Sequence, residues 1–463
     1  MISYKRSIAI LAFIALLTTG AGCGGGGSSV TLERVELEIW RVFDNDDTFD
    51  GVVDAYRALH PNVKIDYREL RFEEYEEELV RAIAEGRGPD IFSLHNTWTR
   101  EYQNLMTPMP STITTQVQET RGTVRKEVVT VEKEEQTMSL RELSSTFVEQ
   151  VEQDVVLSYQ PDEDEAPEDR IFALPLSVDS LALFYNNDLL NAAGIAQPPT
   201  TWTEFQDNVI ALTTYDSTGE VEQSGAALGT SGNVERASDI ISLLMMQNGA
   251  QMTDERGRVT FHEVDGETPE GVYPSYDAIA FYTDFANPTK EVYTWNDNFD
   301  GSLEAFQNGE TAFFLGYSYH IPLIRTAAPK LNFSVTTVPQ INAGREVNFA
   351  NYWVESVSKA SQNSDWAWDF LLFASDEENV TSYLEEAQKP TALRSLIATQ
   401  LDDQWLGPFA AQVLTAKSWY QGYDIDAVDE VMSDLIDEIL AGVEDPEDHM
   451  TSAALRVKQT YQQ

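Results

Sequence analysis

The chain has 463 residues, 42% of them hydrophobic, and a net charge of −47. This length and apolar content are enough for two domains with hydrophobic cores, which excludes a wholly disordered chain. With 77 acidic against 30 basic residues, most of the surface repels nucleic acid, anionic lipid and highly anionic ligands. A solvated acidic surface is the simplest explanation of this charge. The charge therefore limits the possible ligands only weakly, by favouring neutral or cationic molecules.

Residues 1–22 have the features of a signal peptide, because two basic residues precede a short apolar run over 8–17. That run falls short of the roughly 20 residues of a membrane-spanning helix, and no later run approaches that length, so we expect a soluble body. Small residues then lead to Cys23, which as the only cysteine cannot form an internal disulfide. This order resembles a bacterial lipoprotein cleavage box, although Gly20 departs from its usual aliphatic residue. It implies lipidation of Cys23 followed by a Gly/Ser tether, residues 23–30, with a plain secretory signal as the alternative.

The region after the tether alternates strand and helix. The pattern predicts strands and helices, in chain order, over 35–40, 52–59, 63–67, 72–85 and 91–94. In the second helix we expect Phe72, Tyr75, Leu79 and Ile83 on one apolar face. This order indicates a mostly parallel sheet with helices on its faces.

Two polar segments interrupt the pattern. Thr112 to Gln136 is polar and only weakly alternating, and we interpret it as an insertion that forms a surface hairpin or a mobile loop. Ser139 and Glu142 then offer a capping box for one helix, whose apolar stripe runs to Val155. The acidic run over 162–169 is most simply a solvated loop.

The stretch from Ile171 to Phe205 contains several closely spaced signals for the ends of strands and helices. An apolar strand ends in polar residues, after which Asp188 is expected to cap a short helix through Ala193. Two prolines follow, and Thr201 with Glu204 forms a second capping box that starts a new helix.

Four motifs follow one another in that stretch: an aliphatic-Pro step, Leu-x-Tyr-Asn-x-Asp-Leu-Leu, Ala-Gly-Ile and Pro-Pro-x-Thr-Trp-x-Glu-Phe. Their order resembles the first hinge crossing of extracellular solute-binding proteins that feed ABC sugar importers. This family includes the relatives of maltose-binding protein. The block from Trp40 through Gly-x-Gly-Pro-Asp-Ile-Phe is similar to its amino-terminal lobe, and residues 305–317 and 351–358 are similar to its second lobe and returning hinge strand.

The resemblance implies an α/β, two-lobed periplasmic-binding-protein-like fold, each lobe a mostly parallel sheet flanked by helices. It places hinge strands near Val178 to Leu181 and near Trp353 to Glu355. The expected lobes are 31–178 plus 355–400, with 111–137 as the insertion, and 179–354 plus 401–463.

A sugar presents hydroxyl groups and flat C–H faces, so its site needs aromatic rings interleaved with polar side chains. Ligands of such sheets lie beyond the carboxyl ends of the strands. Core packing is the alternative for each aromatic residue. The ligand-binding candidates at these positions are Trp40, Asp44, Asn96, Trp98, Asp179, Trp295, Asn296, Tyr317, Tyr319, Tyr352, Trp353, Trp419 and Tyr420.

Catalytic and metal motifs find little support. Acidic pairs are too numerous to single out two glycosidase carboxylates, and the five histidines lack metal-ligand spacing. A calcium-loop pattern starting at Asp46 has Arg57 where the bidentate Glu belongs, and one starting at Asn296 has Gln307 there. We therefore expect no catalytic residue, no cofactor and no metal.

The resemblance implies an extracytoplasmic, lipid-anchored, monomeric protein that captures a sugar or oligosaccharide between its lobes and presents it to a membrane permease. The same fold with a polyol, glycerophosphodiester or peptide ligand is an alternative. A phosphate ligand is disfavoured because only Arg41 and Arg100 lie near the strand ends. An extracellular glycosidase and an adhesin or sensor lipoprotein are the remaining alternatives.

Overall fold

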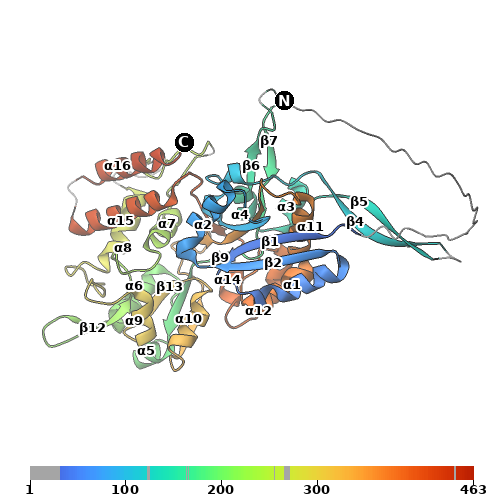
Figure 1. The fold of residues 1–463 in the computed structure, drawn as a ribbon. Helices are drawn as coiled ribbons and strands as arrows, with labels where there is room; N and C mark the ends of the chain where they lie inside the picture. The colour runs from blue at the N-terminus through green and yellow to red at the C-terminus, as the bar shows by residue number, and fades with distance from the viewer. Residues whose placement is uncertain are drawn as a thin grey trace, which may run out of the picture.

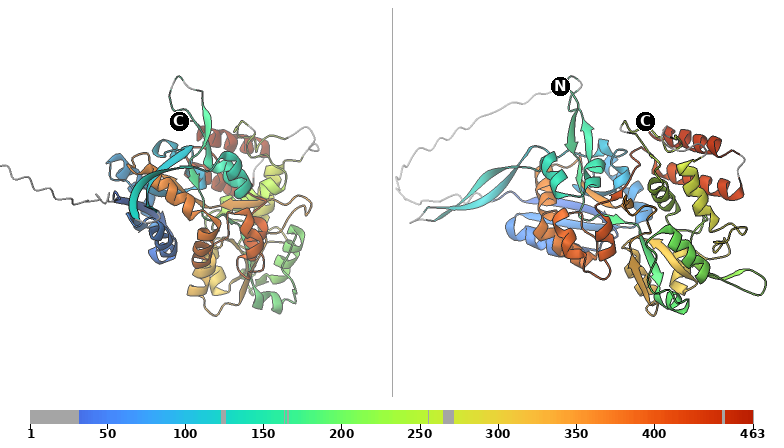
Figure 2. Two further views of the ribbon diagram at one scale, coloured as in Figure 1. Left: turned by 90° about the vertical axis from the view of Figure 1, so that its right-hand side faces the viewer. Right: turned by 180° about the vertical axis from the view of Figure 1, so that it is seen from behind.

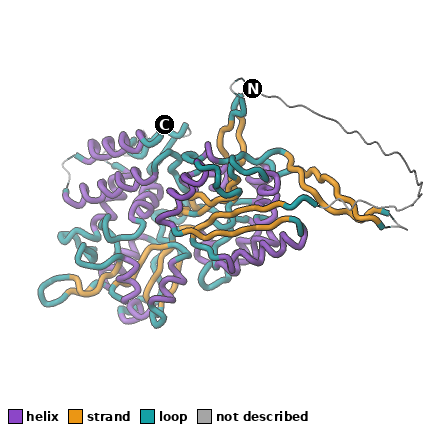
Figure 3. The backbone as a smooth tube through the Cα atoms, viewed as in Figure 1, coloured by secondary structure: helices purple, strands orange, loops and turns teal. Residues whose placement is uncertain are grey.

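The computed structural model describes residues 32–122, 126–162, 164, 166–254, 256–264, 272–442 and 445–462. The expected signal peptide, Cys23 and the whole tether lie outside these residues. The described chain forms two α/β lobes side by side, each with strands at its centre and helices around them (Figure 1, Figure 3). No helix of the described residues is long and apolar enough to cross a membrane.

Lobe 1 is built on a five-stranded sheet in the order β2-β1-β3-β16-β8. Strand β1 pairs in parallel with β2 and β3, whereas β16 is antiparallel to β3 and β8. The strands of this sheet are β1 Val35–Val42, β2 Val63–Leu70, β3 Ile91–His95, β8 Ala173–Leu174 and β16 Trp353–Val357. The helices of this lobe are α1 Asp46–Leu59, α2 Phe72–Ala84, α3 Leu140–Thr146, α4 Glu149–Val155, α11 Ser364–Ala374, α12 Glu377–Ala387 and α13 Ile397–Gln400, with short 3-10 turns η1 Asn96–Trp98, η2 Gln103–Leu105 and η3 Arg394–Leu396.

Lobe 2 is built on a second five-stranded sheet, in the order β11-β12-β13-β10-β14. Its strands are β10 Ala182–Asn186, β11 Thr214–Tyr215, β12 Val221–Ala226, β13 Thr311–Gly316 and β14 Phe333–Thr336. Its helices are α5 Asn187–Ala192, α6 Trp202–Leu212, α7 Ala237–Gln247, α8 Pro274–Asp284, α9 Ser302–Asn308, α10 His320–Ala327, α14 Gly407–Gln412, α15 Ile425–Ala441 and α16 Pro446–Gln459.

The expected two-lobed α/β architecture is confirmed, but the sheets are more mixed than predicted. In lobe 2 only β12 and β13 pair in parallel, while β10 is antiparallel to both its neighbours. The reason is that β10 and β16 follow crossings between the lobes and therefore enter their sheets against the direction of the local strands.

A third, three-stranded sheet joins the lobes, in the order β17-β15-β9, with β9 Asp179–Ser180, β15 Asn348–Asn351 and β17 Ala416–Lys417. In β15, Phe349 packs in the lobe-2 core and Ala350 in the lobe-1 core. Trp353 to Glu355, which we expected in the hinge, belong instead to the lobe-1 sheet. The returning crossing is therefore β15, just upstream.

The Thr112–Gln136 segment forms a hairpin, the first of the two alternatives. Strands β4 Thr112–Arg121 and β5 Glu127–Gln136 pair in antiparallel register and project from lobe 1, as the right-hand view of Figure 2 shows. At its base the Thr114 amide donates to Asp365 at 2.9 Å. A second small hairpin, β6 Val156–Tyr159 with β7 Glu168–Ile171, brackets the acidic run.

Two predicted helix starts are confirmed, whereas one helix end and one helix start need correction. The Ser139 capping box is present, but its helix ends at Thr146 because Phe147 leaves the helix to bridge Leu393. The short helix of lobe 2 is capped by Asn186, not Asp188, since the Asn186 side chain accepts from the amides of 188 and 189. The capping box of Thr201 with Glu204 is confirmed at the start of α6.

Candidate functional site

The carboxyl ends of β1 and β3 and the start of β16 bring five rings together on the side of lobe 1 that faces lobe 2. We call this group, Phe43, Phe72, His95, Trp98 and Trp353, the aromatic platform. Trp353 lies at its centre, with ring centroids 5.7 Å from Phe43, 5.4 Å from Trp98 and 5.6 Å from His95. Phe43 stacks on Phe72 at 5.6 Å and an interplanar angle of 25°.

The outer rings of the platform are open to solvent. Phe43 is 61% exposed and Phe72 47%. Phe43 also has a φ of 69°, a left-handed conformation that is unfavourable for a bulky residue. Such strain is retained where it orients a side chain for contact. Phe72, expected on the apolar helix face, is the first residue of α2, and its side chain therefore lies beyond the lobe-1 core.

Lobe 2 contributes a second aromatic surface. Tyr319 is 45% exposed and stacks against Tyr317 with centroids 6.0 Å apart and planes within 15°. The Tyr317 hydroxyl donates to Asp239 at 2.7 Å, and Arg236 pairs with the same carboxylate at 2.7 Å. Arg236 has a φ of 59° directly before α7, so it too is held in a left-handed conformation. The guanidinium charge is therefore largely neutralised before any ligand arrives.

The connecting sheet supplies polar groups between these two surfaces. The side-chain oxygen of Asn351 accepts a hydrogen bond from His95 Nε2 across 3.1 Å, and its side-chain nitrogen donates to Asp239 at 3.4 Å. Asp179 in β9 accepts hydrogen bonds from the amide and hydroxyl of Ser318, at 2.9 and 2.6 Å. Burial raises the pKa of the Asp179 carboxyl to about 7, although the hydrogen bonds from Ser318 act to lower it.

A cavity of 30 Å³ remains between the lobes, lined on one side by His95 and Thr97 and on the other by Arg236, Asp239 and Trp419. This is room for about two water molecules. A sugar ring can enter here only if the lobes move apart. Burial and the nearby charge of Arg236 lower the pKa of His95 to about 4, so its imidazole is neutral and can both donate and accept.

Two of the predicted residues support the platform from below. The buried carboxylate of Asp154 accepts from the Asn96 amide at 3.0 Å and the Tyr352 hydroxyl at 2.7 Å. Ser418 and Gln150 complete its shell. Because Asn96 and Tyr352 are both buried and both donate to Asp154 in α4, they tie the ends of β3 and β15 to that helix.

Asp44 and Trp40 are also inside lobe 1. Asp44 forms ion pairs with Arg41 at 3.0 Å and with Lys389 at 2.6 Å. Burial opposes ionisation of Asp44, but these two cations bring its pKa below the ordinary value. The Trp40 ring is buried, with Arg68 4.5 Å above it. Asp44 therefore fixes the turn that carries Phe43.

The remaining predicted residues lie in lobe 2. Trp295 is fully buried, stacks on Phe299 at 4.6 Å and donates to Asn233 at 2.9 Å. Asn296 bonds the neighbouring Tyr293 hydroxyl. Trp419 and the buried Tyr420 both line the 30 Å³ cavity; Trp419 donates to Ser242, and the Tyr420 hydroxyl bonds Thr460.

The structure thus brings Trp98, Asp179, Tyr317, Tyr319, Trp353, Trp419 and Tyr420 to the interlobe space, and places Trp295 in the lobe-2 core. Six residues of the site are missing from the sequence-based set: Phe43, Phe72, His95, Arg236, Asp239 and Asn351. Phe72 fitted the apolar stripe, and no local pattern distinguishes Arg236 among 30 basic residues. Among the described residues, no group of three or more His, Cys, Asp or Glu side chains has the arrangement of a metal site.

These features define a two-lobed protein with polar and aromatic surfaces facing each other across a connecting sheet, the architecture of a solute-binding protein. A sequence profile of the bacterial extracellular solute-binding protein family matches residues 43–381. The chain belongs to that family.

Solved structures share this fold at low sequence identity. The maltose-binding periplasmic protein MalE from Listeria monocytogenes, in complex with maltose, is 16% identical, with a TM-score of 0.68 over 92% of this chain and 97% of that chain. The GacH receptor of Streptomyces glaucescens, studied with acarbose, is 17% identical, with a TM-score of 0.67 over 92% and 98%. An ABC transporter solute-binding protein from Thermotoga lettingae, bound with alpha-D-tagatose, is 17% identical, with a TM-score of 0.62 over 92% and 100%.

Proposed function

We propose that the protein is the extracytoplasmic substrate-binding component of an ABC importer, and that it captures a sugar or oligosaccharide between its lobes without converting it. The observation that carries this proposal is that each lobe has exposed rings near the connecting sheet, Phe43 and Phe72 on lobe 1 and Tyr319 on lobe 2. Polar groups of Asn351 and Asp179 lie between them. Rings supply apolar faces for stacking and the polar groups satisfy hydroxyls, as a carbohydrate requires.

Closure of the two lobes around a ligand would make the shape of the protein depend on whether the cleft is occupied. The walls belong to different lobes, and the connecting sheet holds only short strands, such as β9 and β17 with two residues each. A ligand that contacts both walls favours the closed arrangement by its differential affinity for it. A membrane permease that docks to the closed shape then receives only loaded protein.

The amino-terminal sequence supports an anchored location. The signal-like run, Cys23 and the Gly/Ser tether together fit lipidation at Cys23 on the outer side of the cytoplasmic membrane. We propose a monomer held in this way, because a net charge of −47 disfavours self-association.

Neighbouring solved structures with maltose, acarbose and tagatose support a carbohydrate over a phosphate or a peptide. The cations near the site also argue against an anionic ligand, since Arg236 is paired with Asp239 and Lys389 with Asp44. No free cation of the described cleft residues remains to bind a phosphate.

A thermal-shift panel tests the proposal on the purified protein, with mono- and oligosaccharides, polyols, glycerophosphodiesters and peptides as ligands. A ligand that binds only the folded state raises the melting temperature. We expect a saturable shift with one sugar class, lost in Tyr319→Ala and kept in Tyr215→Ala, a tyrosine of similar exposure on β11. Chromatography of the recovered sugar should show no turnover. A shift only with phosphates or peptides would contradict the sugar assignment.

A further inference from the structure

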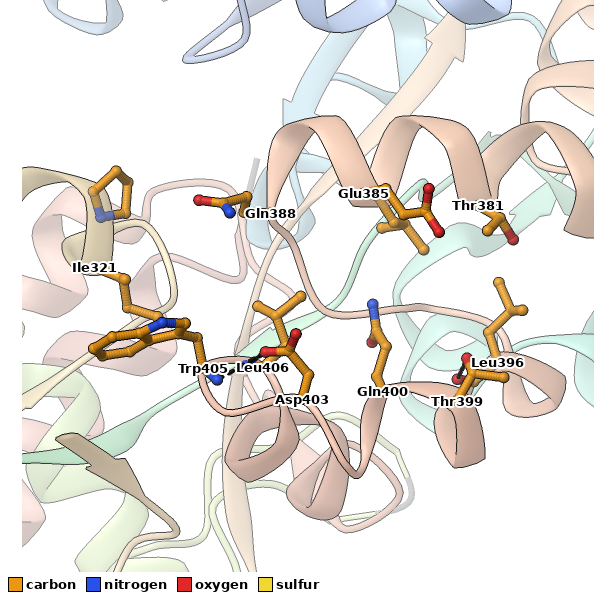
Figure 4. Close-up of a pocket in the computed structure, with 12 residues that line it drawn as sticks. Ile321, Thr381, Glu385, Gln388, Leu396, Thr399, Gln400, Asp403, Trp405 and Leu406 are labelled. Atoms are coloured by element: carbon orange, nitrogen blue, oxygen red, sulfur yellow. Dashed lines mark hydrogen bonds between the residues drawn. The ribbon is translucent and has the colours of Figure 1, made fainter.

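A second groove lies between the lobes, separate from the cleft just described. It has a volume of 440 Å³ and is walled by α12 of lobe 1, by α10 of lobe 2 and by the segment from η3 to Leu406 (Figure 4). Figure 4 shows Thr381, Glu385 and Gln388 along one side and Thr399, Gln400, Asp403 and Trp405 along the other. This volume is within the range of small-ligand sites.

The apolar part of the groove is one aromatic ring with aliphatic neighbours. Trp405 is fixed from behind by Phe333, with centroids 5.0 Å apart, and by Arg325 over its ring at 5.7 Å. The indole is only partly buried, so it keeps surface toward the groove. Ile321 and Leu396 extend this apolar surface on either side.

The polar groups divide into two sets. Gln400 is used internally, because it accepts from the Thr391 amide and donates to the Lys389 carbonyl. Asp403 caps the amides of Trp405 and Leu406 through one oxygen.

On the opposite wall the side chains of Glu385 and Gln388 have no hydrogen-bond partner among the described residues, so both can bond a ligand. Gln388 ends α12 with a φ of 52°, a left-handed conformation that carries its side chain out at the rim.

The groove adjoins the cleft at two points. Gln388 lines the groove, and the next residue, Lys389, reaches the Asp44 carboxylate beside Phe43. On lobe 2, Tyr319 of the cleft directly precedes α10, whose first turn supplies Ile321 and Pro322 to the groove. Tyr319 is therefore adjacent in sequence to the lobe-2 wall of the groove.

We propose that this groove is an accessory carbohydrate site, which holds the distal units of an oligosaccharide whose first units lie in the cleft. Trp405 stacks on a sugar face, while Glu385 and Gln388 bond its hydroxyls. No Lys or Arg lines the groove, which disfavours an anionic occupant. This inference deepens the proposed function and rests on it.

Calorimetric titration of the full protein with short and long members of three series tests the inference: maltose and maltoheptaose, cellobiose and cellohexaose, xylobiose and xylohexaose. We expect the longer member of the recognised series to bind about tenfold more tightly. Glu385→Lys and Trp405→Ala should each remove most of that roughly tenfold gain and leave the affinity for the short sugar unchanged. Glu386→Lys, an exposed neighbour outside the groove, is the matched control for charge.

Each outcome separates the two proposals. Trp405→Ala also removes packing on Phe333, so Glu385→Lys, which alters only an exposed side chain, is the decisive variant. If sugars bind and Tyr319→Ala abolishes binding, but Glu385→Lys keeps the full length dependence, the accessory site is wrong and the proposed function stands. Binding of no saccharide in any series would overturn both.

Discussion

The buried ion cluster beneath the platform gives the sharpest stability prediction. Arg41 is 4% exposed and its Nε donates to Glu355 at 2.9 Å, while its Nη2 lies 3.0 Å from Asp44. Without Arg41, Asp44 keeps Lys389 at 2.6 Å, whereas Glu355 keeps only the Ser93 hydroxyl at 2.6 Å. Arg41→Met therefore leaves the buried Glu355 charge uncompensated, which costs about 3–5 kcal/mol of stability.

Urea unfolding, followed by tryptophan fluorescence and circular dichroism, measures this loss. Glu355→Met alone should cost a similar amount, because it leaves the guanidinium buried. The double variant Arg41→Met with Glu355→Met should lose no more than about 2 kcal/mol, so the coupling energy should be about 4 kcal/mol or more. Arg34→Met, at an exposed pair with Glu36, is the control and should leave the midpoint unchanged. Losses that simply add in the double variant would refute this account of the cluster.

Three further predictions concern single positions. Burial raises the pKa of Asp154 to about 6, so between pH 4 and 6 the folded protein keeps a proton that the unfolded chain has released, and stability falls as pH rises through that window. Asp154→Asn has no carboxyl group to titrate, so its stability does not fall in this window. Urea titrations should therefore show its stability relative to wild type improving by up to about 3 kcal/mol from pH 4 to 7. A difference that does not change with pH would argue against a retained proton. Trp295→Ala should lose about 3–5 kcal/mol from the lobe-2 core in the same assay, and unchanged stability would contradict its burial. Thr201→Ala removes the capping box of α6 and should cost about 1 kcal/mol, whereas Thr218→Ala in an exposed turn should cost less.

The sequence predicts the elements well where the signal is local. Alternating residues identify β1, and Thr201 with Glu204 identifies the start of α6, because both patterns depend on neighbours within four residues. It fails where a distant segment competes. The helix begun at Ser139 stops at Phe147 because that backbone pairs with Leu393, 246 positions further along the chain, and no local pattern contains this contact.

The site is harder to predict than the fold, for the same reason. Trp295 and Trp353 are alike as sequence, yet one is enclosed by Phe299 and Asn233 and the other faces the interlobe space. Which tryptophan keeps an open face depends on how the elements pack. Arg236 likewise cannot be recognised as a site residue from the sequence, because only the fold places it beside Asp239 and Tyr317.

Isothermal titration of the purified protein with the sugar that the thermal-shift panel identifies tests the central claim most directly. The account predicts one saturable binding event in wild type and in Tyr215→Ala. It predicts a loss of about 1–3 kcal/mol of binding free energy, some 5- to 150-fold, in Tyr319→Ala and in Phe43→Ala, because each removes a stacking ring from one wall. Undiminished affinity in both cleft variants would contradict a carbohydrate site between the lobes.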